Sequence, residues 1–127
     1  MSVTYLLDTH VLLWWLDRPA LLSEAARREI SDGRNTMYVS AAAVWEIAIK
    51  KALGKLRAPD NLEEAMAENR FLPLPVTVGH ALGVLKLPLH HRDPFDRMLI
   101  AQALQEGFTL ISRDAHVARY GVPHVKA

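Results

Sequence analysis

The chain contains no cysteine, and this absence removes several classes of chemistry. Disulfide frameworks, thiolate zinc sites and cysteine nucleophiles are all excluded. Long hydrophobic runs are also missing, because the longest unbroken apolar stretch, residues 11–16, is far too short to span a bilayer. The first residues, MSVTYLLD, lack the basic start and the long apolar stretch of a signal peptide. We therefore expect a cytoplasmic protein with no membrane partner.

The chain also lacks an excess of either positive or negative charge. The chain has 15 Lys and Arg against 14 Asp and Glu, so its formal net charge is only +1 and no strong overall field favours nucleic acid. A role on nucleic acid must therefore depend on local sites. Half of the 127 residues are hydrophobic and 23% are charged, which is an ordinary globular balance. This length predicts one domain over residues 1–127.

Short apolar runs bounded by turn residues predict buried strands at residues 3–7, 36–39 and 108–111. Weaker extended segments follow at residues 71–76 and 122–125. Helical patterns lie between them, at residues 10–16, 24–32, 41–53, 61–69, 77–87, 94–106 and 114–120. Strands that alternate with helices predict an α/β fold with a mostly parallel sheet.

Four acidic residues fall at places where such a fold forms sites. Sites in open parallel sheets lie beyond the carboxyl ends of the strands. Asp8 directly follows the first predicted strand, and Asp114 lies just after residues 108–111. Asp96 is in the first turn of the helix before that strand. Glu46 is the only polar residue in AAAVWEIAI, where an ionised carboxylate is costly unless something pairs with it.

Each acid also has a separate structural interpretation. Asp8 and Asp114 can cap the helices that follow them. Asp96 at the third helical position is favoured by the helix dipole without any chemistry. Glu46 can pair with a buried arginine such as Arg97. One shared site explains the positions of all four acids, whereas the structural interpretation needs a separate reason for each. We therefore expect the four side chains to converge.

Convergence of these acids constrains the chemistry. Two carboxylates about 4 Å apart repel by roughly 4 kcal/mol at an effective dielectric constant near 20, so four of them require a cation. Oxygen ligands in a chain without cysteine favour Mg²⁺ or Mn²⁺ over zinc. Such a site lowers the pKa of a bound water and stabilises charge on a phosphodiester. The sequence therefore indicates metal-assisted phosphodiester hydrolysis.

The order and spacing of four segments resemble the PIN domain over essentially the whole chain: YLLDTHVLLWWL, SAAAVWEIAIKK, DPFDRMLIAQAL and LISRD. The stretch HHRDPFDR and the small size are similar to the VapC-type toxins of that family. The resemblance implies a PIN-like three-layer α/β/α sandwich and a metal-dependent endoribonuclease that uses Mg²⁺ or Mn²⁺. It further implies the toxin component of a type II toxin–antitoxin system, with RNA as substrate, a cognate antitoxin as partner and a homodimer as assembly.

The resemblance also implies roles for individual residues. It places a catalytic and metal-binding quartet at Asp8, Glu46, Asp96 and Asp114. Within this quartet, Asp8 and Asp96 are the expected direct ligands. Thr9 and Ser112 match positions where the family often has a hydroxyl that supports the acids. Two roles stay open for Asp93, an outer ligand of the metal or a helix N-cap, and the cap is favoured.

Basic residues near the acids are candidate contacts to RNA phosphates, the part of RNA that every sequence shares. These residues are Lys50, Arg92, Arg97 and Arg113. For Lys50, a solvated position that complements the dipole at the end of its helix is the favoured alternative. His90 and His91 are adjacent, so their side chains diverge in a helix or a strand. We interpret them as loop residues that flank a helix rather than as a catalytic pair.

One rival from another functional class stays open, a catalytically inactive PIN-like module that binds RNA or acts as a scaffold. Such a module is expected to have lost one or more acids, whereas all four are present, which favours the enzyme. For the homodimer, we expect an interface on residues 10–16 or near residues 78–85, because both segments are more apolar than one core-facing stripe requires.

Overall fold

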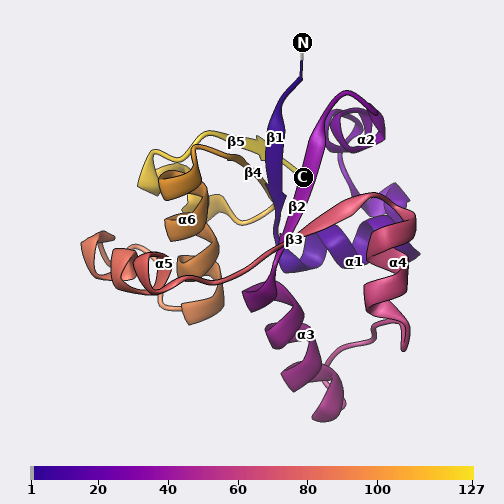
Figure 1. Cartoon of the computed structure of the whole chain (residues 1–127), viewed down its shortest axis with the longest axis horizontal. Helices are drawn as coiled ribbons and strands as arrows, with labels where there is room; N and C mark the ends of the chain where they lie inside the picture. The colour runs from indigo at the N-terminus through magenta and orange to yellow at the C-terminus, as the bar shows by residue number, and fades with distance from the viewer. Residues whose placement is uncertain (1) are drawn as a thin grey trace.

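The structure is a computed structural model that describes residues 2–127, and its strands form one sheet in the order β3-β2-β1-β4-β5 (Figure 1). All neighbouring strands pair in parallel. The predicted α/β fold is therefore confirmed, and the described sheet is parallel throughout. The strands are β1 (Thr4–Leu7), β2 (Thr36–Ser40), β3 (Phe71–Leu74), β4 (Thr109–Ser112) and β5 (His124–Lys126).

Helices cover both faces of the sheet. In Figure 1, α5 and α6 lie to the left of the strands, and α1, α2 and α4 lie to the right. This arrangement is the expected three-layer α/β/α sandwich. The α-helices are α1 (Thr9–Asp17), α2 (Glu24–Ser31), α3 (Ala41–Ala52), α4 (Leu62–Glu68), α5 (Val78–Gly83) and α6 (Pro94–Glu106). Short 3₁₀ helices are η1 (Pro19–Leu21), η2 (Val84–Lys86) and η3 (Ala115–Tyr120).

The strand order places a topological switch beside β1. The chain moves from β1 through β2 to β3 in one direction, then crosses back to β4 on the other side of β1. Right-handed crossovers put the connecting helices of these two directions on opposite faces. The connections consequently diverge beyond the carboxyl ends of β1 and β4, which is where open α/β sheets bind ligands.

Most helix starts are those that the sequence predicts. The Ser23 hydroxyl accepts a hydrogen bond from the backbone N–H of Ala26, and Ser40 caps α3 in the same manner. Asp93 caps α6, and Pro94 is the first residue of that helix. Proline suits this position because a backbone N–H there would have no partner within the helix. The helix ends at Gly107, whose φ of 72° is the left-handed conformation that glycine adopts freely.

The expected helix over residues 77–87 is wrong in its extent. The structure divides it into α5, Val78–Gly83, and the 3₁₀ turn η2, Val84–Lys86. Gly79 and Gly83 weaken a helix at these positions, because glycine loses more backbone entropy than other residues. Residues 114–120 also differ from the expected helix, since η3 is a 3₁₀ helix.

The core lies between the sheet and its helices. Leu6, Leu7, Val39, Leu110 and Ile111 on the three central strands are each at most 1% exposed. They are the short apolar runs from which these strands were predicted. Among residues 2–127 no helix has the length and apolar character needed to cross a membrane.

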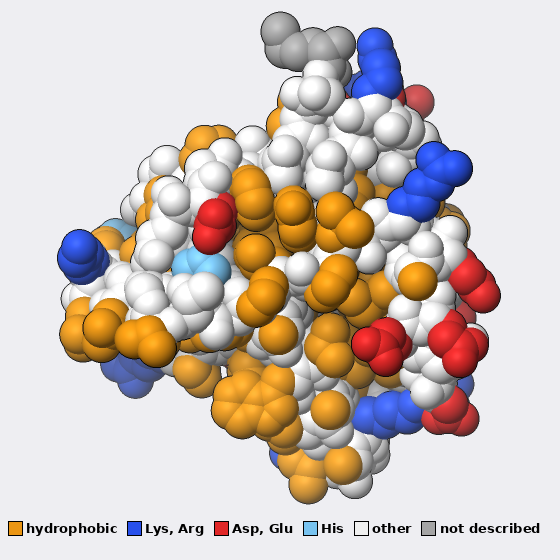
Figure 2. All heavy atoms as spheres, viewed as in Figure 1, with side chains coloured by type: hydrophobic (Ala, Val, Ile, Leu, Met, Phe, Trp, Pro, Cys, Tyr) orange, Lys and Arg blue, Asp and Glu red, His pale blue; other side chains and the backbone are white. Residues whose placement is uncertain are grey.

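Apolar side chains gather over α3 and α5 on the face shown in Figure 2. Exposed apolar residues of α3, α5 and the turn η2 include Leu85 at 82%, Val78 at 77% and Trp45 at 63%. By contrast, the apolar residues Val11, Leu12 and Leu13 of α1 are buried in the core. Of the two segments expected at a dimer interface, residues 78–85 therefore carry the more exposed apolar side chains.

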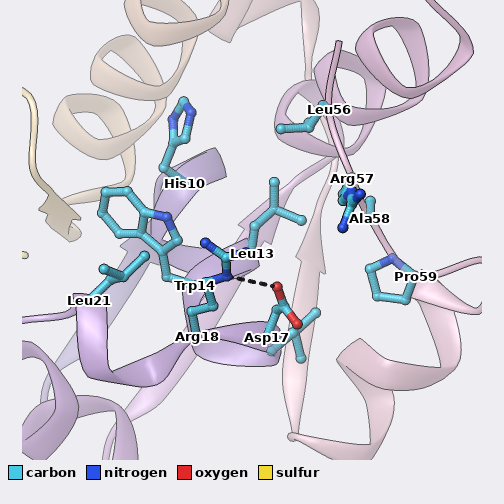
Figure 3. A pocket seen from close by; sticks show the side chains of 11 residues that line it. His10, Leu13, Trp14, Asp17, Arg18, Leu21, Leu56, Arg57, Ala58 and Pro59 are labelled. Atoms are coloured by element: carbon cyan, nitrogen blue, oxygen red, sulfur yellow. Dashed lines mark ion pairs between the residues drawn. The ribbon is translucent and has the colours of Figure 1, made fainter. Parts of the chain in front are cut away.

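A groove of about 490 Å³ runs between α1 and the segment that follows α3 (Figure 3). Leu13 and Trp14 line it from α1, and Leu56 lines it from the opposite side. Two guanidinium groups, those of Arg18 and Arg57, lie beside these apolar side chains. Asp17 also lines the groove and pairs with Arg18 at 3.6 Å. The groove thus combines an apolar lining with a small excess of positive charge, and none of the four acids at the strand ends and in α3 and α6 lines it.

Candidate active site

Asp8 occupies the turn between β1 and α1, where it is only 8% exposed. Its Oδ1 accepts a 2.8 Å hydrogen bond from the backbone N–H of Val11, so it caps α1. Burial raises the pKa of this carboxyl, and the charge of Asp114 raises it further, while hydrogen bonds from Ser112 and Val11 lower it. Asp8 therefore has the helix-capping role that the sequence offered as an alternative. It is also a buried acid whose pKa is raised by the charge of Asp114.

Glu46 is the buried acid of α3, with 3% exposure. Thr9 donates a 2.6 Å hydrogen bond from its hydroxyl to Oε1, and Lys50 approaches Oε2 at 2.5 Å from the next turn of the helix. The hydrogen bond with Glu46 raises the pKa of Lys50. The sequence suggested Arg97 as the partner of Glu46. This prediction is wrong, because Glu46 pairs with Lys50.

Asp96 stands at the start of α6, beside the capping residue Asp93. The Asp93 carboxylate accepts hydrogen bonds from the backbone N–H groups of Phe95 at 2.9 Å and Asp96 at 3.0 Å. Burial raises the pKa of Asp96 to about 7, the charge of Asp93 adds to this rise, and His91 opposes it. The charges of Asp8 and Glu46 raise this pKa as well.

Asp114 follows β4 and caps η3. Its Oδ1 accepts from the backbone N–H of His116 at 2.9 Å, and the His116 ring nitrogen Nδ1 lies 2.8 Å away. Burial raises the pKa of Asp114, but the hydrogen bonds from His116 and His91 outweigh it, so the pKa lies below its usual value. The neighbouring Ser112 hydroxyl accepts from the Asp114 N–H at 3.0 Å, which places Ser112 beside the acids as expected.

Together these positions put the four acids within electrostatic reach of one another. Asp8 is influenced by Asp114, and Asp96 by both Asp8 and Glu46. They come from the ends of β1 and β4, from the start of α6 and from α3, which meet at the switch point of the sheet. Carboxylate oxygens are the ligands that Mg²⁺ and Mn²⁺ prefer, so this donor set fits either ion.

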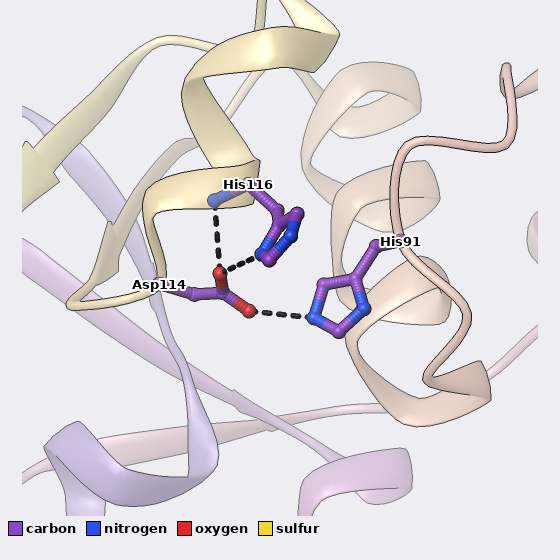
Figure 4. A group of neighbouring side chains, drawn as sticks. All are labelled: His91, Asp114 and His116. Carbon is purple, nitrogen blue, oxygen red and sulfur yellow. Dashed lines mark hydrogen bonds and ion pairs between the residues drawn. The ribbon is translucent and has the colours of Figure 1, made fainter.

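His91 is the residue of this region that sequence reasoning missed. Its Nε2 lies 2.6 Å from Oδ2 of Asp114 and 3.0 Å from Oδ2 of Asp96. With His116 it forms a cluster around Asp114, in which one possible ligand atom from each residue lies within 4.8 Å of the others (Figure 4). The predicted loop position of His91 is confirmed, but its contacts with two of the acids were not predicted. The only sequence signal was its position two residues before the capping Asp93.

The arginines expected at RNA phosphates have other partners. Arg97 donates to the backbone carbonyls of Val84, Leu87, Pro88 and His91 and to the Tyr120 hydroxyl. Arg113 donates to the Leu21 carbonyl and lies over the Trp14 ring at 4.4 Å. These contacts tie both side chains to the protein framework. Lys50 pairs with Glu46, and Arg92 is exposed beside the acids.

Comparisons with known proteins identify the family of this chain. The family model described as PIN domain matches residues 5–123. The chain is 29% identical to Ribonuclease VapC22 of Mycobacterium tuberculosis, over 94% of each chain.

Two solved structures share the fold. VapBC2 from Rickettsia felis, bound to a DNA fragment from its promoter, has a TM-score of 0.72 at 12% identity over 98% of both chains. A toxin–antitoxin complex from Klebsiella pneumoniae has a TM-score of 0.64 at 18% identity over 96% of both chains. The fold, the order of the acidic motifs and the match over residues 5–123 lead to one conclusion. This chain belongs to the PIN domain family.

Proposed function

We propose that this chain is a divalent-metal-dependent endoribonuclease that hydrolyses RNA phosphodiester bonds. The observation that carries the proposal is the set of contacts that connect the acids. His91 Nε2 lies 2.6 Å from Asp114 and 3.0 Å from Asp96, and Thr9, the residue after Asp8, donates to Glu46 at 2.6 Å. Burial raises the pKa of Asp96 to about 7, and the charges of Asp8 and Glu46 contribute to this rise, which supports one shared site rather than separate helix caps. The likeness to a relative named a ribonuclease supports RNA as the substrate.

Asp8 and Asp96 would hold the metal directly, with Glu46 and Asp114 completing the acidic pocket. Bound Mg²⁺ or Mn²⁺ supplies charge stabilisation on the phosphodiester and lowers the pKa of an attacking water. The other residues position the acids. The Val11 N–H orients Asp8, and Thr9 orients Glu46.

Lys50 forms an ion pair with the buried Glu46 at 2.5 Å. Because that lysine is already paired, the exposed Arg92 is the better contact for RNA phosphate among the four predicted basic residues. Arg92 directly precedes Asp93 and the acidic first turn of α6.

The same proposal makes the chain the toxin half of a type II toxin–antitoxin pair. The likeness in fold to a toxin–antitoxin complex supports an antitoxin partner. The groove between α1 and residues 56–59 suits an antitoxin segment with apolar and acidic side chains, because Leu13 and Leu56 line it beside Arg57, whereas Arg18 pairs with Asp17. An Arg57→Glu substitution should weaken binding of the cognate antitoxin, measured by calorimetry, while RNA cleavage by the free protein is kept.

The experiment that tests the nuclease proposal measures cleavage of single-stranded RNA with Mg²⁺, with Mn²⁺ and with chelator. Wild-type protein should cleave only with metal, and Asp8→Asn should lower the rate by about 10³-fold or more, as expected when a metal ligand is lost. Asp60→Asn is the matched control, because Asp60 is fully exposed and pairs only with Lys51. Cleavage that survives complete metal removal, or an active Asp8→Asn variant, contradicts the proposal.

This experiment also decides the alternative of an inactive RNA-binding or scaffold module. No observation in residues 2–127 favours that alternative, since all four acids are present and near one another. A module of that kind would bind RNA without cutting it under every metal condition.

A further inference from the structure

The loop between η2 and α6 places one imidazole between two acids of the candidate active site. His91 Nε2 is 2.6 Å from Asp114 and 3.0 Å from Asp96, and the ring is only 18% exposed. Figure 4 shows the His91 ring pointing from this loop toward the Asp114 carboxylate. The two acids belong to different elements, η3 and α6, so the imidazole connects them across the site.

The other nitrogen of the ring shows how His91 acts. The backbone N–H of Asp93 points at His91 Nδ1 at 3.2 Å, so Nδ1 acts as the acceptor in this arrangement and Nε2 is the nitrogen that faces the carboxylates. His91 is then a hydrogen-bond donor to the carboxylates. A metal-binding histidine has the opposite arrangement, in which one nitrogen binds the ion and the other donates its N–H. The geometry therefore favours a donor over a metal ligand, even though His91, Asp114 and His116 lie close enough to surround an ion.

The loop that carries His91 is held by the same two elements that carry the acids. Tyr120 at the end of η3 accepts hydrogen bonds from the backbone N–H groups of His90 at 3.1 Å and His91 at 2.8 Å. Arg97, which follows Asp96 in α6, donates to four backbone carbonyls of residues 84–91. It also contacts the Tyr120 hydroxyl at 3.3 Å. Acids, loop and imidazole thus form one connected framework.

We propose that His91 is a positioning residue of the active site, whose Nε2–H fixes the Asp114 and Asp96 carboxylates relative to each other, and that Tyr120 and Arg97 fix His91. This inference rests on the proposed nuclease function and deepens it. Two carboxylates on separate elements repel, and a shared donor offsets that repulsion and limits their rotation. Because His91 acts on the acids and not on RNA, its loss lowers turnover rather than RNA affinity.

The kinetic test uses His91→Leu, which removes the donor, and His91→Gln, which keeps an N–H of similar reach. At saturating metal, His91→Leu should lower kcat by about 10²-fold, the usual consequence of misplaced catalytic groups. His91→Gln should recover about tenfold of that loss, and KM for RNA should stay within about twofold of wild type in both variants. His124→Gln, an exposed histidine on β5, is the matched control and should behave as wild type. A KM increase at constant kcat would mean that His91 contacts RNA and would overturn the proposal.

A second variant tests the framework. Tyr120→Phe removes only the hydroxyl that accepts from the loop, so it should lower kcat by a few-fold. In the His91→Leu background the same substitution should have no further effect, because both act through one imidazole. Multiplicative, independent effects would overturn the inferred connection between Tyr120 and His91.

A spectroscopic test needs neither RNA nor catalysis. Nitrogen-15 NMR of the histidine rings should find His91 protonated on Nε2 and unprotonated on Nδ1, both with chelator and with Mg²⁺. Loss of the Nε2 proton when Mg²⁺ is added would make His91 a metal ligand and would overturn the positioning role. This measurement separates the two proposals, since it tests the placement of His91 even in a chain that cuts no RNA.

Discussion

Thr9 donates a 2.6 Å hydrogen bond to Glu46, and this bond joins the residue after Asp8 to the acid of α3. Both side chains are 3% exposed, so neither group has water as an alternative partner. The bond connects the carboxyl end of β1 with the middle of a separate helix. It therefore fixes the distance between two parts of the candidate active site that are 37 residues apart in sequence.

Replacing Thr9 tests this connection. Thr9→Val keeps the shape but removes the hydroxyl, leaving a buried carboxylate oxygen short of a donor, and should lower the free energy of unfolding by about 1–3 kcal/mol. RNA cleavage should fall as well, because Glu46 is no longer oriented. Thr9→Ser keeps the hydroxyl and should lose only about 0.8 kcal/mol in urea denaturation, for the one buried methyl group that serine lacks. A valine variant as stable as wild type would show that the bond contributes nothing.

Lys50 and Lys51 offer a matched pair of substitutions on one helix. Lys50 pairs with the buried Glu46, whereas Lys51 pairs with the fully exposed Asp60. Lys50→Met should therefore cost about 1–2 kcal/mol of unfolding free energy, since it leaves a buried carboxylate without its counter-charge. Lys51→Met should cost less than about 0.5 kcal/mol, as exposed ion pairs do. Similar losses in the two variants would contradict the distinct environment of Glu46.

The pKa of Asp96 gives the metal-free protein a particular pH dependence. Its value of about 7 in the folded state lies above the ordinary 3.8, so the folded protein binds more protons than the unfolded chain between these values. Stability measured in chelator should accordingly decrease as the pH rises from about 4 to about 7. The raised pKa of Asp8 acts in the same direction. Asp96→Asn should flatten this part of the profile, and an unchanged slope in that variant would assign the effect to another group.

Sequence patterns predicted the fold and the acids because both depend on local features. Apolar runs bounded by turns gave the strands, and Asp8 and Asp114 stood out at strand ends. The roles of His91 and Arg97 could not be predicted in this way. Their partners include Tyr120, which is 29 residues from His91 and 23 from Arg97, and nothing in the loop sequence specifies that contact. Spacing predicts which elements form, but it does not show how a loop packs against a distant element.

The exposed apolar face near α5 predicts how the chain assembles. Val78 and Leu85 are 77% and 82% exposed, and removing such side chains from water favours association. Wild-type protein should be a dimer in light scattering at tens of micromolar, and Leu85→Lys should shift it to monomer. Leu21→Lys, beside α1, is the control and should stay dimeric. Dissociation by the second substitution alone would assign the interface to the α1 surface.

Thermal melting with chelator and with excess Mg²⁺ tests most directly whether Asp8, Glu46, Asp96 and Asp114 form one metal site. In chelator, the acids of the wild type repel one another, so Asp8→Asn and Asp96→Asn should each melt higher than wild type. Asparagine still caps α1 in the first variant, and the second forfeits only about 0.3–1 kcal/mol of helix-dipole stabilisation. Excess Mg²⁺ should stabilise the wild type and have little effect on either variant. Variants that both melt lower than wild type in chelator and still respond fully to Mg²⁺ would contradict the shared site.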